Sequence, residues 1–517
     1  MTFKNAFILS LALVLFSSAV ADAANTAWAV GTNTCLFLDD EFIAEQSGLT
    51  RTWHQGKPRP EIAIKEKEPW ENWPTLWGSC FFDPKYKVYR MYYQTTLLPS
   101  GEPGISFRDN LCYAESKDAK TWVKPNLGLV EFNGSTSNNI LISFAGPPVV
   151  MLDPLATDPA GRLKMFTYIL KKQPVSGGNS HCCCLQSEDG IHWSFFGQLR
   201  LPGFAKPEEG GFNDLFPVMW DGIRNCYLGD FRAFSTHKIG ELPSADGKTK
   251  NVRRRAIGIT RTDSKTPVKG WSPSRMILHA DDEDDQRAAK FSKDPDKPEW
   301  AEMYVMPMFT YGNHYFGLIT FFDKVDSKDC NGGGDLQLAY SNDGDNWHRA
   351  LDRKSAVEHT TDDPELFPNF AQFNPPLDMG DEIWIFYSEN NGTHGITPFD
   401  KSKGRIRAAA WRKDGFVSLD ATDRATLVTK PLVFDGKTMH VNCNTRKGGS
   451  VRVALLDEQG KPLPGFGLKN CDPLTGNSVS QQVTWNKKSA LTALGGKTIR
   501  LRFELTKCQL WSFRFAP

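Results

Sequence analysis

The sequence reads SKDAKTW at residues 116–122, SEDGIHW at 187–193 and SNDGDNW at 341–347. Two weaker copies, TRTD at 260–263 and WRKDGF at 411–416, fill the gaps in the series. The aspartates of the five copies are 71, 74, 80 and 71 residues apart along the chain. Aspartate and glycine suit a tight turn, and the aromatic residue that follows can pack between sheets. A period this regular indicates five repeated units.

Each unit begins with a run that reads as strand, polar turn and strand, such as FFDPKYKVYRMYY or FTYGNHYFGLITFF. Aromatic and β-branched residues with a period of two favour strands throughout. Units of four strands are typical of propeller blades. We therefore predict an all-β protein, with a five-bladed β-propeller over residues 30–420. A set of separate β-sandwiches is the alternative.

The repeat stops near residue 420, and short alternating strands separated by turn residues follow. Residues 425–517 are therefore predicted to form a C-terminal β-sandwich. The junction, residues 420–429, is short and is not rich in glycine or serine, which favours packing of the two domains on each other.

The N-terminus resembles a secretory leader. Lys4 precedes a short apolar run at residues 6–16, and small residues follow at 17–24. We predict a signal peptide at residues 1–23 and a secreted or periplasmic protein; a membrane anchor is the alternative. No later run approaches the length of a membrane span. With 61 Lys+Arg against 60 Asp+Glu, the chain offers no basic footprint for nucleic acid.

Two segments of the sequence contain residues that could bind a metal ion. Cys182–Cys184 follow His181, but adjacent strand residues point to opposite faces, which favours buried thiols or a local disulfide. The acidic run at residues 281–285 could hold Ca²⁺ or could be a solvated loop. We expect no metal in the site itself and no organic cofactor. The 11 cysteines cannot all pair within one chain, although one pair among the last three could staple the sandwich.

Propellers place function where the inner strands of all blades converge, so acids at the starts of inner strands are the candidates. Cleavage of a glycosidic bond needs two carboxyl groups, one protonated and one ionised. Asp153 is predicted to be a stabiliser or base, and Asp214 and Glu302 are the acid/base candidates. Asp153→Asn is predicted to abolish turnover without unfolding the protein. Carbohydrate binding also needs aromatic platforms and polar partners, for which the candidates are Trp70, Trp73, Trp77, Glu71, Glu389 and His394.

These motifs resemble glycoside hydrolase family 32 and its propeller relatives in families 43 and 68. Leu152-Asp153-Pro154 resembles that family's Arg-Asp-Pro motif, and Asp214-Leu215-Phe216-Pro217 resembles the stretch after its acid/base glutamate. The segments at 36–40, 124–129 and 457–462 resemble a group of secreted bacterial proteins related to family 32. The resemblance implies a five-bladed propeller with a β-sandwich and a carbohydrate substrate.

The chain departs from the family at two of its three carboxylates. The stretch that corresponds to the family's nucleophile, residues 75–79, contains no acid, and Glu208 and Glu209 lie upstream of the expected glutamate position. We predict an exported glycoside hydrolase-like protein. The alternatives are a carbohydrate-binding propeller without catalysis and a sialidase-type enzyme, since SxDxGxxW motifs also occur in sialidases.

Overall fold

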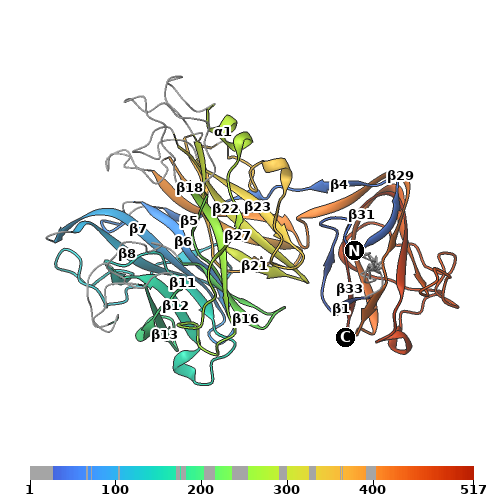
Figure 1. The fold of residues 1–517 in the computed structure, drawn as a ribbon, viewed down its shortest axis with the longest axis horizontal. Helices are drawn as coiled ribbons and strands as arrows, with labels where there is room; N and C mark the ends of the chain where they lie inside the picture. The colour runs from blue at the N-terminus through green and yellow to red at the C-terminus, as the bar shows by residue number, and fades with distance from the viewer. Residues whose placement is uncertain are drawn as a thin grey trace, which may run out of the picture.

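The computed structural model describes residues 27–65, 68–71, 73–102, 105–169, 175, 182–202, 216–235, 254–289, 300–324, 334–360, 362–363, 365–391 and 403–517. The chain forms a five-bladed β-propeller and a β-sandwich beside it (Figure 1). Both predicted architectures are thus present, and the count of five blades is confirmed. No helix among these residues is long and apolar enough to cross a membrane.

Each blade is an antiparallel sheet whose first strand lies innermost. The first blade contains β6 (Pro74–Asp83), β7 (Val88–Glu102), β8 (Ile105–Ser116), β9 (Trp122–Val123) and β10 (Ile140–Ser143). The second contains β11 (Val149–Leu152), β12 (Leu163–Tyr168), β13 (Cys182–Ser187) and β14 (Ser194–Gln198). The third contains β15 (Val218–Asp221), β16 (Cys226–Asp230), β17 (Ala233–Ser235), β18 (Arg254–Thr262) and β19 (Arg275–Leu278).

The fourth and fifth blades repeat this arrangement. The fourth contains β20 (Trp300–Val305), β21 (Met308–Tyr311), β22 (His314–Lys324), β23 (Gly334–Ser341) and β24 (His348–Arg349). The fifth contains β25 (Phe367–Ala371), β26 (Leu377–Asp378), β27 (Glu382–Asn390), β28 (Gly404–Arg412) and β5 (Lys57–Lys65). Since β5 precedes the first blade in sequence, it closes the ring by pairing with β28.

The repeated aspartate motif forms the turn after the third strand of its blade. In the first blade, Asp118 Oδ1 accepts hydrogen bonds from the backbone N–H groups of Lys120 and Thr121, both at 2.8 Å. These bonds lower the pKa of Asp118. Trp122 Nε1 donates to the Ala119 carbonyl at 3.2 Å. The motif therefore turns the chain and anchors its tryptophan, which is why it recurs with the blades.

The sandwich is built from both ends of the chain. Its longest sheet follows the order β3-β29-β33-β31-β32, with β2 and β4 added at β33 and β29. The strands are β2 (Cys35–Leu36), β3 (Ile43–Ser47), β4 (Thr50–Trp53), β29 (Val417–Thr429), β31 (Thr438–Leu456), β32 (Asn477–Gln482) and β33 (Arg500–Ala516), and β1 (Trp28–Gly31) pairs with β30 (Leu432–Phe434).

The predicted boundaries, 30–420 and 425–517, do not separate the strands in this way. The gap between them falls inside β29, and β2, β3 and β4 lie in the sandwich although their residues were assigned to the propeller. Sheet pairing between distant segments cannot be read from local patterns, which explains the difference.

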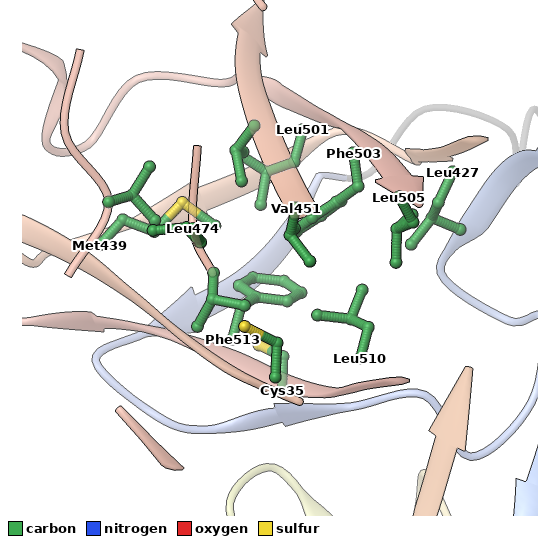
Figure 2. Packing of buried hydrophobic residues seen from close by; sticks show 14 of the residues in the cluster. Cys35, Leu427, Met439, Val451, Leu474, Leu501, Phe503, Leu505, Leu510 and Phe513 are labelled. Atoms are coloured by element: carbon green, nitrogen blue, oxygen red, sulfur yellow. The ribbon is translucent and has the colours of Figure 1, made fainter. Parts of the chain in front are cut away.

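A single apolar core holds the sandwich together. Figure 2 shows Cys35 from the N-terminal segment among Met439, Val451, Phe503 and Phe513 of the long strands. All five are 4% exposed or less. The four cysteines of this core, Cys35, Cys443, Cys471 and Cys508, are buried free thiols, so the core depends on packing and not on the predicted disulfide.

A short helix, α1 (Asp282–Ala289), follows β19, and 3-10 turns occupy Pro159–Gly161, Leu351–Arg353 and Thr492–Leu494. The acidic run that suggested Ca²⁺ forms the start of α1. Asp281 pairs with Arg353, Asp284 with Arg349 and Asp285 with Arg254. These carboxylates bind arginines of the third and fourth blades, and no group of metal ligands is found among the described residues.

Candidate active site

The inner strands of three blades meet at an aromatic cluster. Trp77 of β6 lies parallel to Tyr304 of β20, with ring centroids 5.7 Å apart and 9° between the planes. Phe370 of β25 meets Trp77 edge-on at 4.2 Å and lies 6.1 Å from Tyr304. Trp77 is the fourth of the 10 residues of β6, Tyr304 the fifth of 6 in β20 and Phe370 the fourth of 5 in β25. In the fourth and fifth blades, β21 and β26 pair with the same second strands, β22 and β27, farther along the chain. The inner strands of three blades therefore converge at this cluster.

Glu302 lies beside this cluster, two residues before Tyr304 on β20. Its side chain is 2% exposed. Arg255 Nη1 lies 3.4 Å from Glu302 Oε2, and Trp300 Nε1 donates a hydrogen bond to Oε1 at 3.3 Å. Arg255, which pairs with Glu302, also lies over the Tyr304 ring, so the carboxylate and the ring share a neighbour. The sequence-predicted Glu302 is thus buried, paired and next to the aromatic cluster.

Two arginines from the third blade complete this side of the cluster. The guanidinium carbons of Arg232 and Arg255 lie 4.7 and 4.9 Å from the centre of the Tyr304 ring. Cations at this distance from an aromatic face are attracted by its quadrupole. The arrangement gathers positive charge around a buried carboxylate and a stacked aromatic pair.

A second carboxyl group in this region was missed by sequence reasoning. Asp230, the last residue of β16, is 3% exposed and accepts a hydrogen bond from the Met306 backbone N–H at 2.7 Å. Burial raises the pKa of Asp230 to about 7, against the opposing effects of that bond and of Arg232. The sequence signal was an acid at the end of the buried run Cys-Tyr-Leu-Gly, followed at once by Phe231 and Arg232.

Asp230 and Glu302 therefore occupy different electrostatic environments. Asp230 is partly protonated at neutral pH because it is buried with little charge compensation. Glu302 has an arginine at ion-pair distance. Arg232 acts on Asp230 and also covers the ring of Tyr304, and Arg255 pairs with Glu302 and covers the same ring. Carboxyl pairs held in different protonation states are the usual equipment for acid/base chemistry.

Glu389 lies on the fifth blade and is also neutralised by arginine. Arg405 Nε lies 2.5 Å from Glu389 Oε2, Arg407 Nε lies 3.4 Å from it, and Tyr387 donates to Oε1 at 2.8 Å. Asp362 bridges the same two arginines at 2.9 and 3.0 Å. Glu389 is paired with Pro368 of the inner strand, so this cluster sits at the starting end of β25.

Trp73 lies just before β6 and faces the fifth blade. It is 7% exposed, and a Cβ atom on Gly404 would approach its ring to 2.4 Å. Neither amide atom of the adjacent Asn390 has a hydrogen-bond partner among the described residues, and Trp73 Nε1 has none either. These unsatisfied groups mark a polar spot at the seam of the first and fifth blades.

Glu71 and Trp70 stabilise that same seam farther from the channel. Glu71 binds Lys124 in an ion pair and accepts a hydrogen bond from Tyr93 at 2.5 Å. Trp70 Nε1 donates to Asn139 at 2.8 Å, and its ring packs against the core shared by the two blades. Both residues therefore have full structural roles, and of the three predicted tryptophans only Trp77 lies in the aromatic cluster.

Asp153 lies at the opposite end of the inner strands. It follows the last residue of β11, whereas Glu302 lies near the start of β20. Asp153 accepts a hydrogen bond from Tyr227 of the next blade at 2.7 Å and lies 3.2 Å from Lys164 Nζ. The fold does not bring Asp153 and Glu302 together. Asp214 and His394, the remaining predicted residues, lie outside the described residues.

No family model matches the chain, and no curated protein matches it in sequence, so the resemblance to family 32 remains a prediction. Similar solved structures include a glycosyl hydrolase from Bacteroides ovatus, at 11% identity over 70% of this chain and 94% of that one, with a TM-score of 0.40. Another is described in work on the GH130 family of mannoside phosphorylases, at 11% identity, 70% and 94% coverage and a TM-score of 0.41. A family 117 glycoside hydrolase from Zobellia galactanivorans shows 10% identity, 70% and 90% coverage and a TM-score of 0.37. Sequence identities and TM-scores this low carry no argument about function, which must be inferred from the residues of this chain.

Proposed function

We propose that this protein is an exported glycoside hydrolase whose active site lies at the starting end of the inner strands. The observation that carries the proposal is the grouping of Glu302, Arg255 and Arg232 around the Trp77–Tyr304 aromatic pair, with Asp230 behind it. Export follows from the leader-like N-terminus. The substrate class is a poly- or oligosaccharide, because sugars combine hydroxyl groups with apolar ring faces.

In the proposed mechanism, Asp230 is the acid. Its raised pKa keeps it partly protonated at neutral pH, so it can donate its proton to the glycosidic oxygen as the bond to the anomeric carbon breaks. Glu302 acts as the ionised partner, either accepting a proton from the attacking water or bonding to the anomeric carbon before water displaces it. Water supplies the hydroxyl group of the new reducing end, and the proton balance needs no organic cofactor.

A carbohydrate-binding protein without catalysis is the second candidate. The observation that favours it is the full pairing of the glutamates: Glu302 with Arg255, Glu389 with Arg405, and Glu71 with Lys124. A carboxylate that already binds an arginine or a lysine has fewer free lone pairs with which to contact a substrate or a water molecule. This reading keeps the same aromatic cluster as the ligand site.

The test is a reducing-sugar release screen of the mature protein against a broad polysaccharide panel. Glu302→Gln and Asp230→Asn remove the two proposed groups at the starting end, and Asp153→Asn removes the acid at the other end. We expect release by the wild type, loss in the first two variants and retention in folded Asp153→Asn. Release by folded Glu302→Gln would overturn the assignment, and glycan binding without any release would favour the binding protein.

A further inference from the structure

A cavity of about 1060 Å³ lies between the fifth blade and the sandwich, away from the aromatic cluster. Its lining includes Trp53, the last residue of β4, together with His54 and the start of β5, and on the sandwich side residues 477–480 of β32 and Trp511. Its volume is at the upper end of the range for ligand sites. Neither the aromatic cluster nor the proposed catalytic groups contribute to it.

Side-chain bonds hold the two walls of this cleft together. Arg412 of β28 donates to Asn442 at 2.8 Å and to Asn477 at 2.6 Å, both in the sandwich. Ser512 of β33 donates to Asp414 at 2.6 Å from the other direction. The cleft is therefore a fixed feature of the fold, and a ligand would not have to draw the two domains together.

His54 presents a hydrogen-bond acceptor there. Ser418 Oγ donates to Asp420 at 2.6 Å, because a carboxylate only accepts, so the 2.8 Å contact between Ser418 and His54 is a bond donated by His54 Nε2. Burial lowers the pKa of His54, which keeps the ring neutral at neutral pH. Nδ1 is then the acceptor nitrogen, and the ring is steadied by Trp511, 4.4 Å away between centroids.

The lining of the cleft carries charges of both signs. The cations are Arg51, Lys57, Arg59, Lys354 and Arg412, and the acids are Asp352, Glu358, Asp381 and Glu382. A polyanion or a polycation would therefore meet repulsive as well as attractive charges. The lining has few aliphatic side chains, so an apolar peptide face would find little to bury against. Trp53, half-buried against Tyr340 at 5.0 Å, offers a flat aromatic surface beside these donors and acceptors.

We propose that this cleft binds an uncharged oligosaccharide segment and so holds a polysaccharide substrate away from the active site. The choice of a polysaccharide as the source of that segment rests on the proposed function, whereas the cleft's preference for an uncharged polyhydroxylated ligand rests on its own residues. Trp53 would stack on a sugar ring, and His54 Nδ1 would accept a hydrogen bond from a sugar hydroxyl group. The charged side chains at the rim would donate and accept further hydrogen bonds.

Affinity gel electrophoresis tests this directly, with laminarin, arabinoxylan and galactomannan as neutral probes and polygalacturonate as the acidic probe. The variants are Trp53→Ala and Glu358→Trp. The second fills the cleft from an exposed position, so it tests the site even if the first fails to fold. The matched control is Glu458→Trp, which places the same side chain at an exposed position of the sandwich.

We expect at least one neutral polysaccharide to retard the wild type, and both cleft variants to bind it at least ten-fold more weakly. Glu458→Trp should match the wild type. Equal retardation of wild type and cleft variants, or retardation by polygalacturonate alone, would overturn the proposal. Glu302→Gln separates the proposed catalytic role from the proposed binding cleft. If this variant loses hydrolysis but is still retarded in the gel, and the retardation still depends on the cleft, both proposals are supported. Hydrolysis by Glu302→Gln with the same retardation overturns only the catalytic assignment.

Discussion

The two ends of the propeller's inner strands use acidic residues in different ways. At the finishing end, Asp153 and Asp221 follow or end their strands, and each accepts a hydrogen bond from a tyrosine of the next blade, Tyr227 and Tyr315. At the starting end, Glu302 and Asp230 lie among arginines and stacked aromatic rings. The first arrangement occurs in two successive blades, the second and the third, whereas the second arrangement occurs where different blades contribute different side chains.

Repetition distinguishes a structural role from a chemical one. An acid that occupies the same strand position in different blades and bonds to the next blade stabilises the ring. An acid whose neighbours come from three blades lies in an environment that is found at one place, as a binding or catalytic site requires. We therefore expect Asp153 to stabilise the ring and Glu302 to act in the proposed site.

The largest effect is expected at Glu302. Changing it to glutamine removes the ionised partner of the proposed acid, so hydrolysis should fall by roughly three orders of magnitude. The side chain keeps its shape and can still accept the Trp300 bond, so the melting temperature should stay within a few degrees of the wild type. Reducing-sugar release and thermal denaturation of the same sample check both parts.

Asp153→Asn should show the reverse. It leaves Lys164 buried without its partner and weakens the Tyr227 bond, which should cost about 3 kcal/mol of unfolding free energy. Urea denaturation measures this loss, and Tyr227→Phe, which removes one hydrogen bond, should cost about 1 kcal/mol. The sequence-based expectation was a folded protein without turnover. Such a result would return Asp153 to the site and contradict the division between the two ends.

Asp230→Asn should make the protein more stable at high pH. A carboxyl whose folded-state pKa lies near 7 disfavours folding once the unfolded chain ionises near pH 4, and its cost grows until the pH passes 7. At pH 8 the free energy of unfolding of the variant should therefore exceed that of the wild type by a few kcal/mol, whereas at pH 4 the two values should be nearly equal. Hydrolysis by the wild type should decline as the pH rises through 7, because the proposed acid loses its proton.

The smallest effect belongs to the turn motif. Burial opposes ionisation of Asp343, but the N–H groups of Asn346 and Asp345 and the side chains of Asn346 and Ser341 outweigh it and lower the pKa to about 2. This stability is present above pH 4 and is lost as the pH falls toward 2. Asp343→Asn should cost about 1 kcal/mol at pH 7, discounted for exposure, and almost nothing at pH 2. Thermal melts at both pH values check it, and an equal loss at both would show that charge is not the cause.

The repeated motif made the fold predictable. A turn that must bind its own backbone, followed by a tryptophan that must be buried, can be read locally, and its period counts the blades. The ring closure by β5 and the N-terminal strands of the sandwich were not predictable in this way. Both depend on pairing between segments more than 300 residues apart, such as Arg405 with Lys65 or Thr426 with Ser47.

The site was only partly predictable. Glu302 and Trp77, which belong to the proposed site, could be named from the sequence because acids and aromatic residues near inner strands are unusual enough to stand out. Asp230 was missed because it ends a second strand, and the burial that raises its pKa depends on how the folded chain packs around it. The end of the channel to which Asp153 belongs depends on where β11 stops, which local patterns place only to within a few residues.

The strand content, the number of blades and the turn chemistry can be predicted from the sequence alone, because each depends on residues close together in the chain. Which acids lie close together, which blade contains the N-terminal strand β5 and where the cleft between propeller and sandwich lies can be seen only in the folded structure. Those properties arise from contacts between different blades and domains, and the electrostatic environment of a carboxyl group is set by such neighbours more than by its place in the sequence.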